Sequence, residues 1–346
     1  MATTIDNKVY RPSTFNDVMG QEDVKEYLKL KVQAFKSTGT PLGHLLFLGM
    51  SGLGKTTLAQ VLANELGVPY VEIFAPAISD VDMLIGTFKS VKPNSVVFVD
   101  EIHSWSRAIQ EKLYGILEDF KYSEYNDYHE VIQYHDVNRF TLIGATTDVG
   151  KLLPPLVGRF KYEAHLMPYT NVQLAELIRV AATKSYGIQL PLATSEAMAQ
   201  VAQGTPRLAR RYLTGMYELV AGTHGGNILG DYFSTDLFST MLRFERRDPF
   251  LGLDYSQRKY LSVLSGETTG LGAEALAQVT GEKLVTIEDK IEPFLMMDST
   301  LPGHDSGSLV KRSRKGREIT ALGREYLKMC KQLQEKGWFT GEKLAV

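Results

Sequence analysis

The sequence predicts an α/β domain with a parallel sheet, followed by an all-α domain and a small C-terminal domain of short helices and turns. Continuous apolar runs at residues 45–48, 96–99 and 140–143 alternate with helical patterns in the first half. The pattern becomes purely helical after Pro168 and changes again near Asp248, where glycine-rich turns separate short helices. Apolar strands between helices are typical of a parallel sheet that is buried on both faces.

The composition is that of an ordinary globular protein and excludes several classes. The chain has 346 residues, 44% hydrophobic and 23% charged, with a formal net charge of −2. Nucleic acid would therefore have to be bound by a local basic patch. The single cysteine, Cys330, excludes a disulfide framework and a cysteine-based zinc cluster. No signal peptide or membrane-length apolar run is visible, so we expect a cytoplasmic protein.

Changes of pattern along the chain predict the domain boundaries and several helix starts. We expect domains over residues 1–168, 169–246 and 247–335, with a loose tail over 336–346. Asn171 is expected to cap the first helix of the second domain, and Pro206 to begin another. Thr286 and Asp289 have the spacing of a capping box, which predicts a helix start in the third domain.

Residues 49–56 have the pattern of a phosphate-binding loop. They match G-x-x-x-x-G-K-[ST] and lie between a predicted strand and a predicted helix, as a P-loop does. Glycines let backbone N–H groups face phosphates, and the helix N-terminus adds a favourable dipole. Lys55 would reach the β- and γ-phosphates and Thr56 would bind Mg²⁺. The alternative is a glycine-rich turn with an incidental lysine.

Two acids follow the next apolar strand. Asp100 is expected to hold Mg²⁺, directly or through water, and Glu101 to polarise the attacking water. The alternative is a pair of surface acids at a strand end. We expect His103 to be a packing or supporting residue rather than a metal ligand. The strand at 140–143 leads into Gly-Ala-Thr-Thr, where a hydroxyl could sense the γ-phosphate.

Taken in order, these motifs resemble those of the RuvB family, the AAA+ motors that drive branch migration of Holliday junctions. The resemblance extends from about Arg11 to about Leu327. Its motifs are Arg11-Pro12, Gly20-Gln21, residues 52–59, 100–103 and 140–147, Pro155-Leu156, Arg159-Phe160, residues 204–209 and 286–289, and Glu292-Pro293.

The resemblance implies an AAA+ P-loop NTPase with a helical lid domain and a C-terminal winged-helix domain. It implies an ATPase with bound ATP and Mg²⁺. The catalytic residues would be Lys55, Asp100, Glu101, Thr147 as sensor 1, Arg159 as the arginine finger and Arg207 as sensor 2. Nucleotide would be bound by Arg11, Pro12, Gly20, Gln21, Gly49, Gly52, Leu53, Gly54, Lys55, Thr56, Thr57 and Arg207. The metal would be held by Thr56 and Asp100. A finger that acts on a neighbour's ATP requires an oligomer, which in this family is a hexameric ring around duplex DNA.

A basic run near the C-terminus predicts a DNA contact. Five of the seven residues at 311–317 are basic: Lys311, Arg312, Arg314, Lys315 and Arg317. In a winged-helix domain they would bind phosphates of a duplex or a four-way junction without sequence preference. The alternative is a solvated loop.

The sequence departs from the family in four places. Met50 and Ser51 replace P-loop prolines, and Asp148 and Val157 replace arginines near the expected subunit interface. The hairpin at 121–138, which in the family docks on the partner RuvA, is rich in tyrosines and acids. An insertion-like stretch at 303–309 precedes the basic run. Dependence on a RuvA-like partner is therefore open, and the divergence favours a bacterial or phage-borne relative.

Three functions are compatible with these residues. A DNA-translocating motor is favoured by the winged helix and the basic run. A clamp-loader-like or helicase-loader-like switch would instead bind and release a protein partner, and the altered hairpin leaves that reading open. A regulator without turnover is disfavoured because Lys55, Asp100 and Glu101 are all present.

Overall fold

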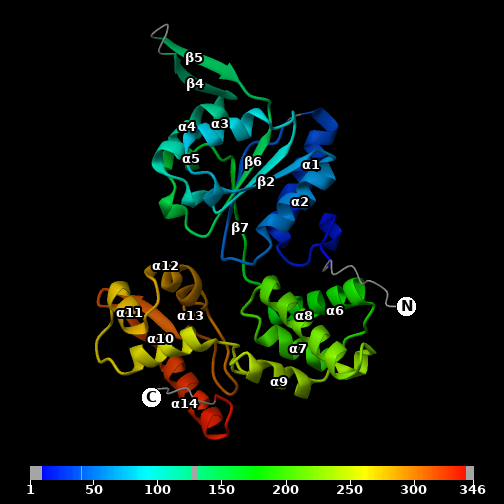
Figure 1. Cartoon of the computed structure of the whole chain (residues 1–346), viewed down its shortest axis with the longest axis vertical. Coiled ribbons are helices and arrows are strands. Elements are labelled where there is room, and N and C mark those ends of the chain that lie inside the picture. Colours follow the sequence, from blue (N-terminus) through cyan, green and yellow to red (C-terminus); the bar gives the residue numbers. More distant parts are fainter. Residues whose placement is uncertain (1–9, 40, 127–130, 340–346) are drawn as a thin grey trace. The chain divides into compact units, whose positions relative to one another are not determined.

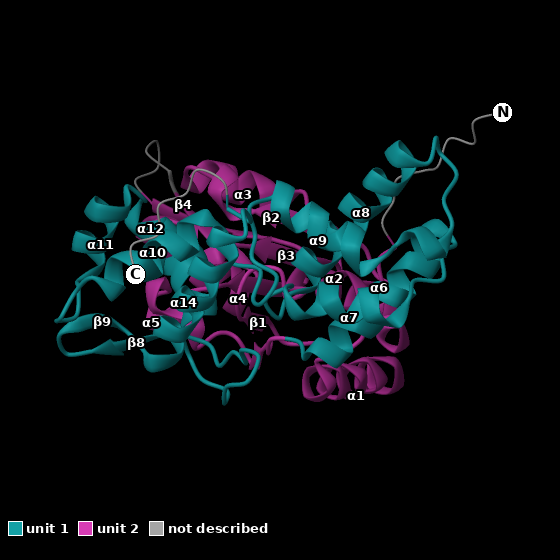
Figure 2. Cartoon of the chain, turned by 90° about the horizontal axis from the view of Figure 1, so that it is seen from below, with its two compact units in different colours: residues 1–9, 169–346 teal, residues 10–168 magenta. Residues whose placement is uncertain are grey.

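The computed structural model describes residues 10–39, 41–126 and 131–339 (Figure 1). The chain divides into two compact units, one over Tyr10–Pro168 and the other containing residues from Tyr169 onward (Figure 2). Residues 169–339 belong to one unit, so the predicted boundary between residues 246 and 247 stays a prediction. No described helix is both long enough and apolar enough to cross a membrane.

The first unit contains a five-stranded parallel sheet. In spatial order its strands are β2 (Tyr70–Phe74), β3 (Val96–Asp100), β6 (Thr141–Thr146), β1 (Leu45–Leu48) and β7 (Tyr162–His165). Every residue of β1 and β6 is buried, as the continuous apolar runs predict. The three predicted strands are confirmed, although the last begins at Thr141 and reaches Thr146.

Helices cover both faces of this sheet. The helices α1 (Glu22–Thr38) and α2 (Lys55–Leu66) lie on one side, and α3 (Val81–Lys89), α4 (Arg107–Glu118) and α5 (Pro154–Val157) lie on the other (Figure 1). In α4, Ile109, Leu113 and Ile116 recur at helical spacing and are buried in the core. The side chain of Ser106 caps this helix by accepting the Ile109 N–H. Short 3₁₀ helices occupy Phe15–Asp17, Ala75–Ala77, Ile102–Ser104 and Val149–Lys151.

His44 is a buried polar connector just before β1. Its Nδ1 accepts the Leu142 N–H at 2.9 Å, so its Nε2 carries the proton and donates to the Leu117 carbonyl at 2.9 Å. Burial lowers the pKa of His44 below 6.5, and the charge of Lys161 lowers it further against the opposing effect of the Leu117 bond. The imidazole therefore joins β1, β6 and α4 in its neutral form.

A hairpin follows α4 directly. Its strands are β4 (Lys121–Asn126) and β5 (Val131–Asp136), antiparallel and in register from Lys121↔Asp136 to Asn126↔Val131. The predicted hairpin is confirmed; its residues 127–130 lie outside the described residues. Tyr122 is buried and stacks on His135, whereas Ile132 and Tyr134 are exposed on β5.

The second unit begins with four helices: α6 (Asn171–Tyr186), α7 (Leu192–Gln200), α8 (Pro206–Thr223) and α9 (Thr235–Phe244). The prediction that Asn171 caps α6 is wrong by one residue, because the Thr170 hydroxyl accepts the Gln173 N–H and closes a capping box. Pro206 begins α8 as predicted. At the start of the unit, the Tyr169 N–H donates to the Gly204 carbonyl at 2.9 Å.

The C-terminal part has the order of elements of a winged helix. These elements are α10 (Tyr255–Ser265), α11 (Ala273–Thr280), α12 (Leu284–Thr286), a π-helical segment (Ile287–Ile291), α13 (Glu292–Leu295), β8 (Val310–Ser313), β9 (Gly316–Ile319) and α14 (Ala321–Glu335). A short 3₁₀ helix at Gly230–Tyr232 lies earlier in the chain, before α9. The strands β8 and β9 form an antiparallel hairpin, and Leu271 bridges to Arg317 on β9. Ser299 and Gly307 exchange two backbone hydrogen bonds, which closes the insertion-like stretch into a loop.

The predicted capping box at Thr286 is wrong. The helical stretch begins two residues earlier, at Leu284, after an extended Lys283. Thr286 has helical torsions of φ −66° and ψ −39°, and its side chain makes no capping hydrogen bond. A capping residue needs an extended backbone, so Thr286 cannot serve as one.

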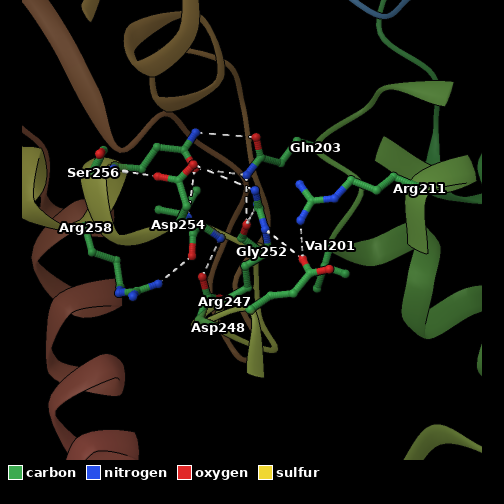
Figure 3. Close-up of polar contacts among 12 residues, drawn as sticks. Val201, Gln203, Arg211, Arg247, Asp248, Gly252, Asp254, Ser256 and Arg258 are labelled. Atoms are coloured by element: carbon green, nitrogen blue, oxygen red, sulfur yellow. Dashed lines mark hydrogen bonds and ion pairs between the residues drawn. The ribbon is translucent and has the colours of Figure 1, made fainter. Parts of the chain in front are cut away.

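A buried polar network joins the helical part to the winged-helix part within this unit (Figure 3). Asp248 is fully buried and accepts the N–H groups of Phe250, Leu251 and Leu253 at 2.6 to 2.8 Å. Its Oδ2 also accepts the Tyr326 hydroxyl of α14 at 2.8 Å. The carboxylate therefore fixes the turn between α9 and α10 to the last helix.

The segment after α14 packs against this network. The Trp338 indole N–H donates to the Arg247 carbonyl at 2.8 Å, and Phe339 is buried with its ring 4.0 Å from the Arg258 guanidinium. The prediction of a loose tail is therefore wrong for residues 336–339. Residues 340–346 lie outside the described residues.

Candidate functional site

The P-loop connects β1 to α2 at the carboxyl edge of the sheet. Gly49, Gly52 and Gly54 all have positive φ, and a Cβ on Gly49 would lie 2.7 Å from the Leu166 carbonyl. Only glycine fits these positions without strain. Lys55 is buried, and its ammonium donates to the Gly49 and Met50 carbonyls at 2.6 and 3.1 Å. The positive charge is thus held inside a loop whose backbone can bind phosphate.

The other residues of the P-loop also suit phosphate binding. Leu53 is buried and anchors the loop in the core, whereas Thr56 and Thr57 lie half-buried in the first turn of α2. Gly54 caps this helix in the left-handed conformation. The helix N-terminus therefore opens directly from the loop, which is the arrangement that favours an anion.

The two acids lie at the same edge on a nearby strand. Asp100 ends β3, and Glu101 follows with a left-handed φ of 55°. Because β3, β6 and β1 are adjacent, Asp100, Thr146 and the P-loop end three neighbouring strands. Ligands of open α/β sheets bind at such an edge. A left-handed non-glycine residue at this place is strained, and the surrounding structure must hold it there.

His103 connects Glu101 to the end of β6. Its Nδ1 lies 3.3 Å from a Glu101 carboxylate oxygen and 2.9 Å from the Thr146 hydroxyl, which also accepts the Asp148 N–H at 2.9 Å. Thr146 is fully buried, whereas Thr147, the predicted sensor 1, lies half-buried just beyond the strand. The sequence predicts a supporting role for His103, but its contact with both Glu101 and Thr146 is visible only in the structure. Its position two residues after Glu101 was the available signal.

Gln21 holds the N-terminal segment against the end of the first unit. Its side-chain amide donates to the Met167 carbonyl at 2.7 Å and accepts the Met167 N–H at 3.0 Å. Gly20 and Gln21 both have positive φ, while Arg11 is exposed and Pro12 half-buried. The role of these four residues in binding adenine stays a prediction.

Arg159 lies at the opposite edge of the sheet from the P-loop. It comes just before β7, whose first residue pairs with the first residue of β1. Its Nη2 lies 2.7 Å from a Glu118 oxygen, its Nη1 donates to the Pro155 carbonyl at 2.6 Å, and its guanidinium stacks on Tyr114 at 4.4 Å. The strand β1 alone spans roughly 13 Å. Arg159 therefore cannot reach the P-loop of its own chain.

Arg207 belongs to the other unit. It is the second residue of α8, and its side chain is exposed. Its predicted role as sensor 2 stays a prediction.

The basic residues at 311–317 form the hairpin β8–β9, with Arg314 and Lys315 at its turn. Arg312 and Arg317 face each other across the two strands and both contact the carboxylate of Glu292. Glu292 was quoted in the sequence only as part of a motif. Its contacts are 20 and 25 residues further along the chain, so no local pattern indicated them.

This fold and site define a P-loop NTPase of the AAA+ type with a winged helix. Residues 10–166 match the Holliday junction DNA helicase RuvB P-loop domain, and residues 250–328 match the RuvB C-terminal winged helix domain. The chain belongs to the RuvB family.

Individual relatives agree over most of the chain. A Holliday junction branch migration complex subunit RuvB from Campylobacter hominis is 35% identical, with 95% of this chain and 93% of the relative covered. Among solved structures, the Thermotoga maritima RuvB Holliday junction branch migration motor is 30% identical with a TM-score of 0.77, covering 92% of this chain and 98% of that chain. A point mutant of the same protein gives a TM-score of 0.79 at 30% identity, with coverages of 92% and 99%.

Proposed function

We propose that this protein is an ATP-dependent motor that moves duplex DNA at Holliday junctions. The observation that carries the proposal is the convergence of P-loop, Asp100 and Glu101 on neighbouring strand ends, in a chain of the RuvB family with a winged helix. Relatives that are similar over nearly the whole length are named as branch migration subunits.

The residues at the carboxyl edge of the sheet fit a nucleotide with Mg²⁺. Lys55 and the loop amides would bind the phosphates, while Thr56 and Asp100 would hold the metal, which neutralises charge on the phosphates. Glu101 is the base that orients water, and its carboxylate lies beside His103, which also contacts the Thr146 hydroxyl. Thr147 as sensor 1 and Arg207 as sensor 2 complete the proposed catalytic residues. The adenine of the nucleotide would be bound by Arg11, Pro12, Gly20 and Gln21.

Arg159 serves the ATP of a neighbouring subunit. Its place at the amino edge of the sheet supports this role, because the distance excludes its own P-loop. Head-to-tail contacts between successive subunits form a ring when the rotation between them closes. We propose a ring of six subunits. Asp148, which replaces a family arginine, pairs with Lys151 at 3.3 Å, so its negative charge is partly balanced within the chain.

The partner at the hairpin β4–β5 is a separate question. Ile132 is 60% exposed and Tyr134 is 71% exposed, so β5 offers apolar surface for a protein to cover. Whether that protein is RuvA-like decides between a partnered motor and a self-sufficient one. A loader-type switch would use the same surface for a different partner.

The test is steady-state ATP hydrolysis by the full chain, alone and with duplex or four-way-junction DNA, at low and moderate salt. We expect turnover that Lys55→Ala abolishes and that junction DNA stimulates. Turnover that Lys55→Ala leaves unchanged would refute the site. Intact turnover that no DNA stimulates, even with a RuvA-type protein added, would favour the loader-type switch.

A further inference from the structure

The five basic residues of the hairpin β8–β9 have different surroundings. Lys311 lies 3.4 Å from a Glu318 oxygen, and Arg312 and Arg317 are both bonded to Glu292. Arg314 and Lys315, at the turn, make no ion pair with any carboxylate in the part of the chain that the structure describes. These two cations at the turn are therefore the ones of the five that no carboxylate within 4 Å holds in the described part of the chain.

Glu292 is the centre of a saturated network. Its side chain is 1% exposed, and its oxygens accept the Tyr260 hydroxyl at 2.8 Å, Arg312 Nη2 at 2.6 Å and Arg317 Nε at 2.8 Å. Burial alone would raise the pKa of Glu292, but the hydrogen bonds from Arg317, Arg312 and Tyr260 together lower it. The carboxylate is ionised, and a buried charge of this kind is tolerated only because it is paired.

This single carboxylate connects three parts of the winged helix. Glu292 begins α13, Tyr260 lies in the middle of α10, and Arg312 and Arg317 lie opposite each other on β8 and β9. Arg317 also reaches Glu288 at 3.4 Å, one turn before Glu292. Both strands of the hairpin are thus held to the helix that precedes them.

Backbone hydrogen bonds also hold the hairpin β8–β9 in place. The Arg317 N–H and carbonyl bond to Leu271 at 2.7 and 3.0 Å, and a Cβ on Gly316 would lie 2.3 Å from the Leu271 carbonyl. Gly316 has a φ of 113°. Both this torsion and the lack of space for a Cβ require glycine at this position. The turn that carries Arg314 and Lys315 is therefore held in one orientation.

We propose that Glu292 is a positioning residue for DNA binding. Through Arg312 and Arg317 it locks the hairpin β8–β9 onto α10 and α13, so that Arg314 and Lys315 meet the DNA phosphates. The inference rests on the proposed function, since it concerns how that function's DNA contact is held. Arg312 and Arg317 orient the hairpin, and Arg314 and Lys315 supply the phosphate contacts.

The salt dependence of DNA binding distinguishes the cations that contact phosphates from the residues that position the hairpin. Each neutralised phosphate contributes about 0.9 to the slope of log affinity against log salt. The double variant Arg314→Ala, Lys315→Ala should lower the slope by about 2 for each subunit that contacts the duplex. Glu292→Gln removes no cation, so it should weaken binding about tenfold while the slope stays unchanged.

The experiment uses the full chain and a fluorescein-labelled, blunt-ended duplex, with anisotropy measured over a series of NaCl concentrations. Arg317→Lys should resemble Glu292→Gln, because lysine keeps the charge but loses the planar fork that bonds Glu292. The matched control is Glu325→Gln on α14, which removes an exposed carboxylate paired with Lys328 and should leave binding unchanged. Basal ATP hydrolysis and the thermal unfolding curve show that each variant is folded. Should Glu292→Gln fail that check, Arg317→Lys decides the question.

Two results would overturn the inference while leaving the proposed function intact. Tighter binding by Glu292→Gln with a steeper salt slope would mean that the freed Arg312 and Arg317 contact phosphates directly. Full affinity of Arg317→Lys would mean that charge alone matters at that position. Failure of the unchanged chain to bind any duplex would overturn both the inference and the DNA part of the proposed function.

Discussion

If Arg159 acts on a neighbouring subunit, two inactive variants should restore each other. The chain with Lys55→Ala keeps an intact finger but has a defective pocket, and the chain with Arg159→Ala has the opposite defect. The Arg159→Ala chain should lose about a thousandfold or more in kcat, the usual contribution of an arginine finger, and the Lys55→Ala chain should be inactive because its pocket cannot hold the phosphates. Mixed assemblies contain interfaces where an intact pocket meets an intact finger.

The expected recovery follows from the position of Arg159 at the amino edge of the sheet. In an equal mixture half of the subunits have an intact pocket, and half of these have a neighbour with an intact finger. Up to about a quarter of the native activity per subunit should therefore return, provided that contacts are head-to-tail and sites are independent. A finger that acted within its own chain would give no recovery at any ratio.

The assay is ATP hydrolysis after the two variants are mixed and allowed to exchange subunits, with one carrying an affinity tag. Co-purification of the untagged chain establishes that mixed assemblies formed. As a control, Arg107→Ala removes an exposed arginine of α4 that pairs with Glu111, and its mixture with native protein should keep full activity. Mixed assemblies of the two inactive variants that stay inactive would refute the reasoning.

Three further outcomes are expected. Glu118→Gln should change kcat no more than about fivefold, because Glu118 is 62% exposed and such ion pairs are weak; a loss as large as that of Arg159→Ala would contradict this. Asp248→Asn should lower the free energy of unfolding by roughly 2–4 kcal/mol in urea denaturation, because the amide N–H₂ would oppose buried donors; Asp305→Asn, an exposed position, should cost nothing measurable. His44 has a folded-state pKa below 6.5, so the unfolded chain binds the proton first and stability should fall as pH drops below 6.5. Melting temperatures between about pH 7.5 and pH 5.5 should show a flatter dependence for His44→Gln, and equal slopes would contradict the assignment.

Much of the first unit could be predicted because its signals are local. The runs at 45–48 and 96–99 are buried strands, and the glycines of residues 49–54 adopt the torsions that a P-loop needs. A short apolar run flanked by helical patterns leaves little choice of structure. Capping was less predictable: Thr170 and Asn171 are both good capping residues, and the backbone torsions, which the sequence does not display, decide between them.

The remaining features depend on contacts between distant residues. The hairpin at 311–317 could be recognised as basic, but the anchoring of Arg312 and Arg317 depends on Glu292, which lies 20 and 25 residues away. The tail prediction failed in the same way, since Trp338 bonds to Arg247, 91 residues earlier. Polar sequence near a terminus indicates disorder only when no distant surface receives it.

The residues on either side of Pro168 are each anchored by backbone hydrogen bonds within their own unit. Met167 is held on both its N–H and its carbonyl by Gln21, and Tyr169 is held by the Gly204 carbonyl. Only Pro168 lies between these two anchors, and its ring fixes φ near −65°. Pro168 has no N–H, so this residue adds no backbone hydrogen-bond donor between the two anchored residues.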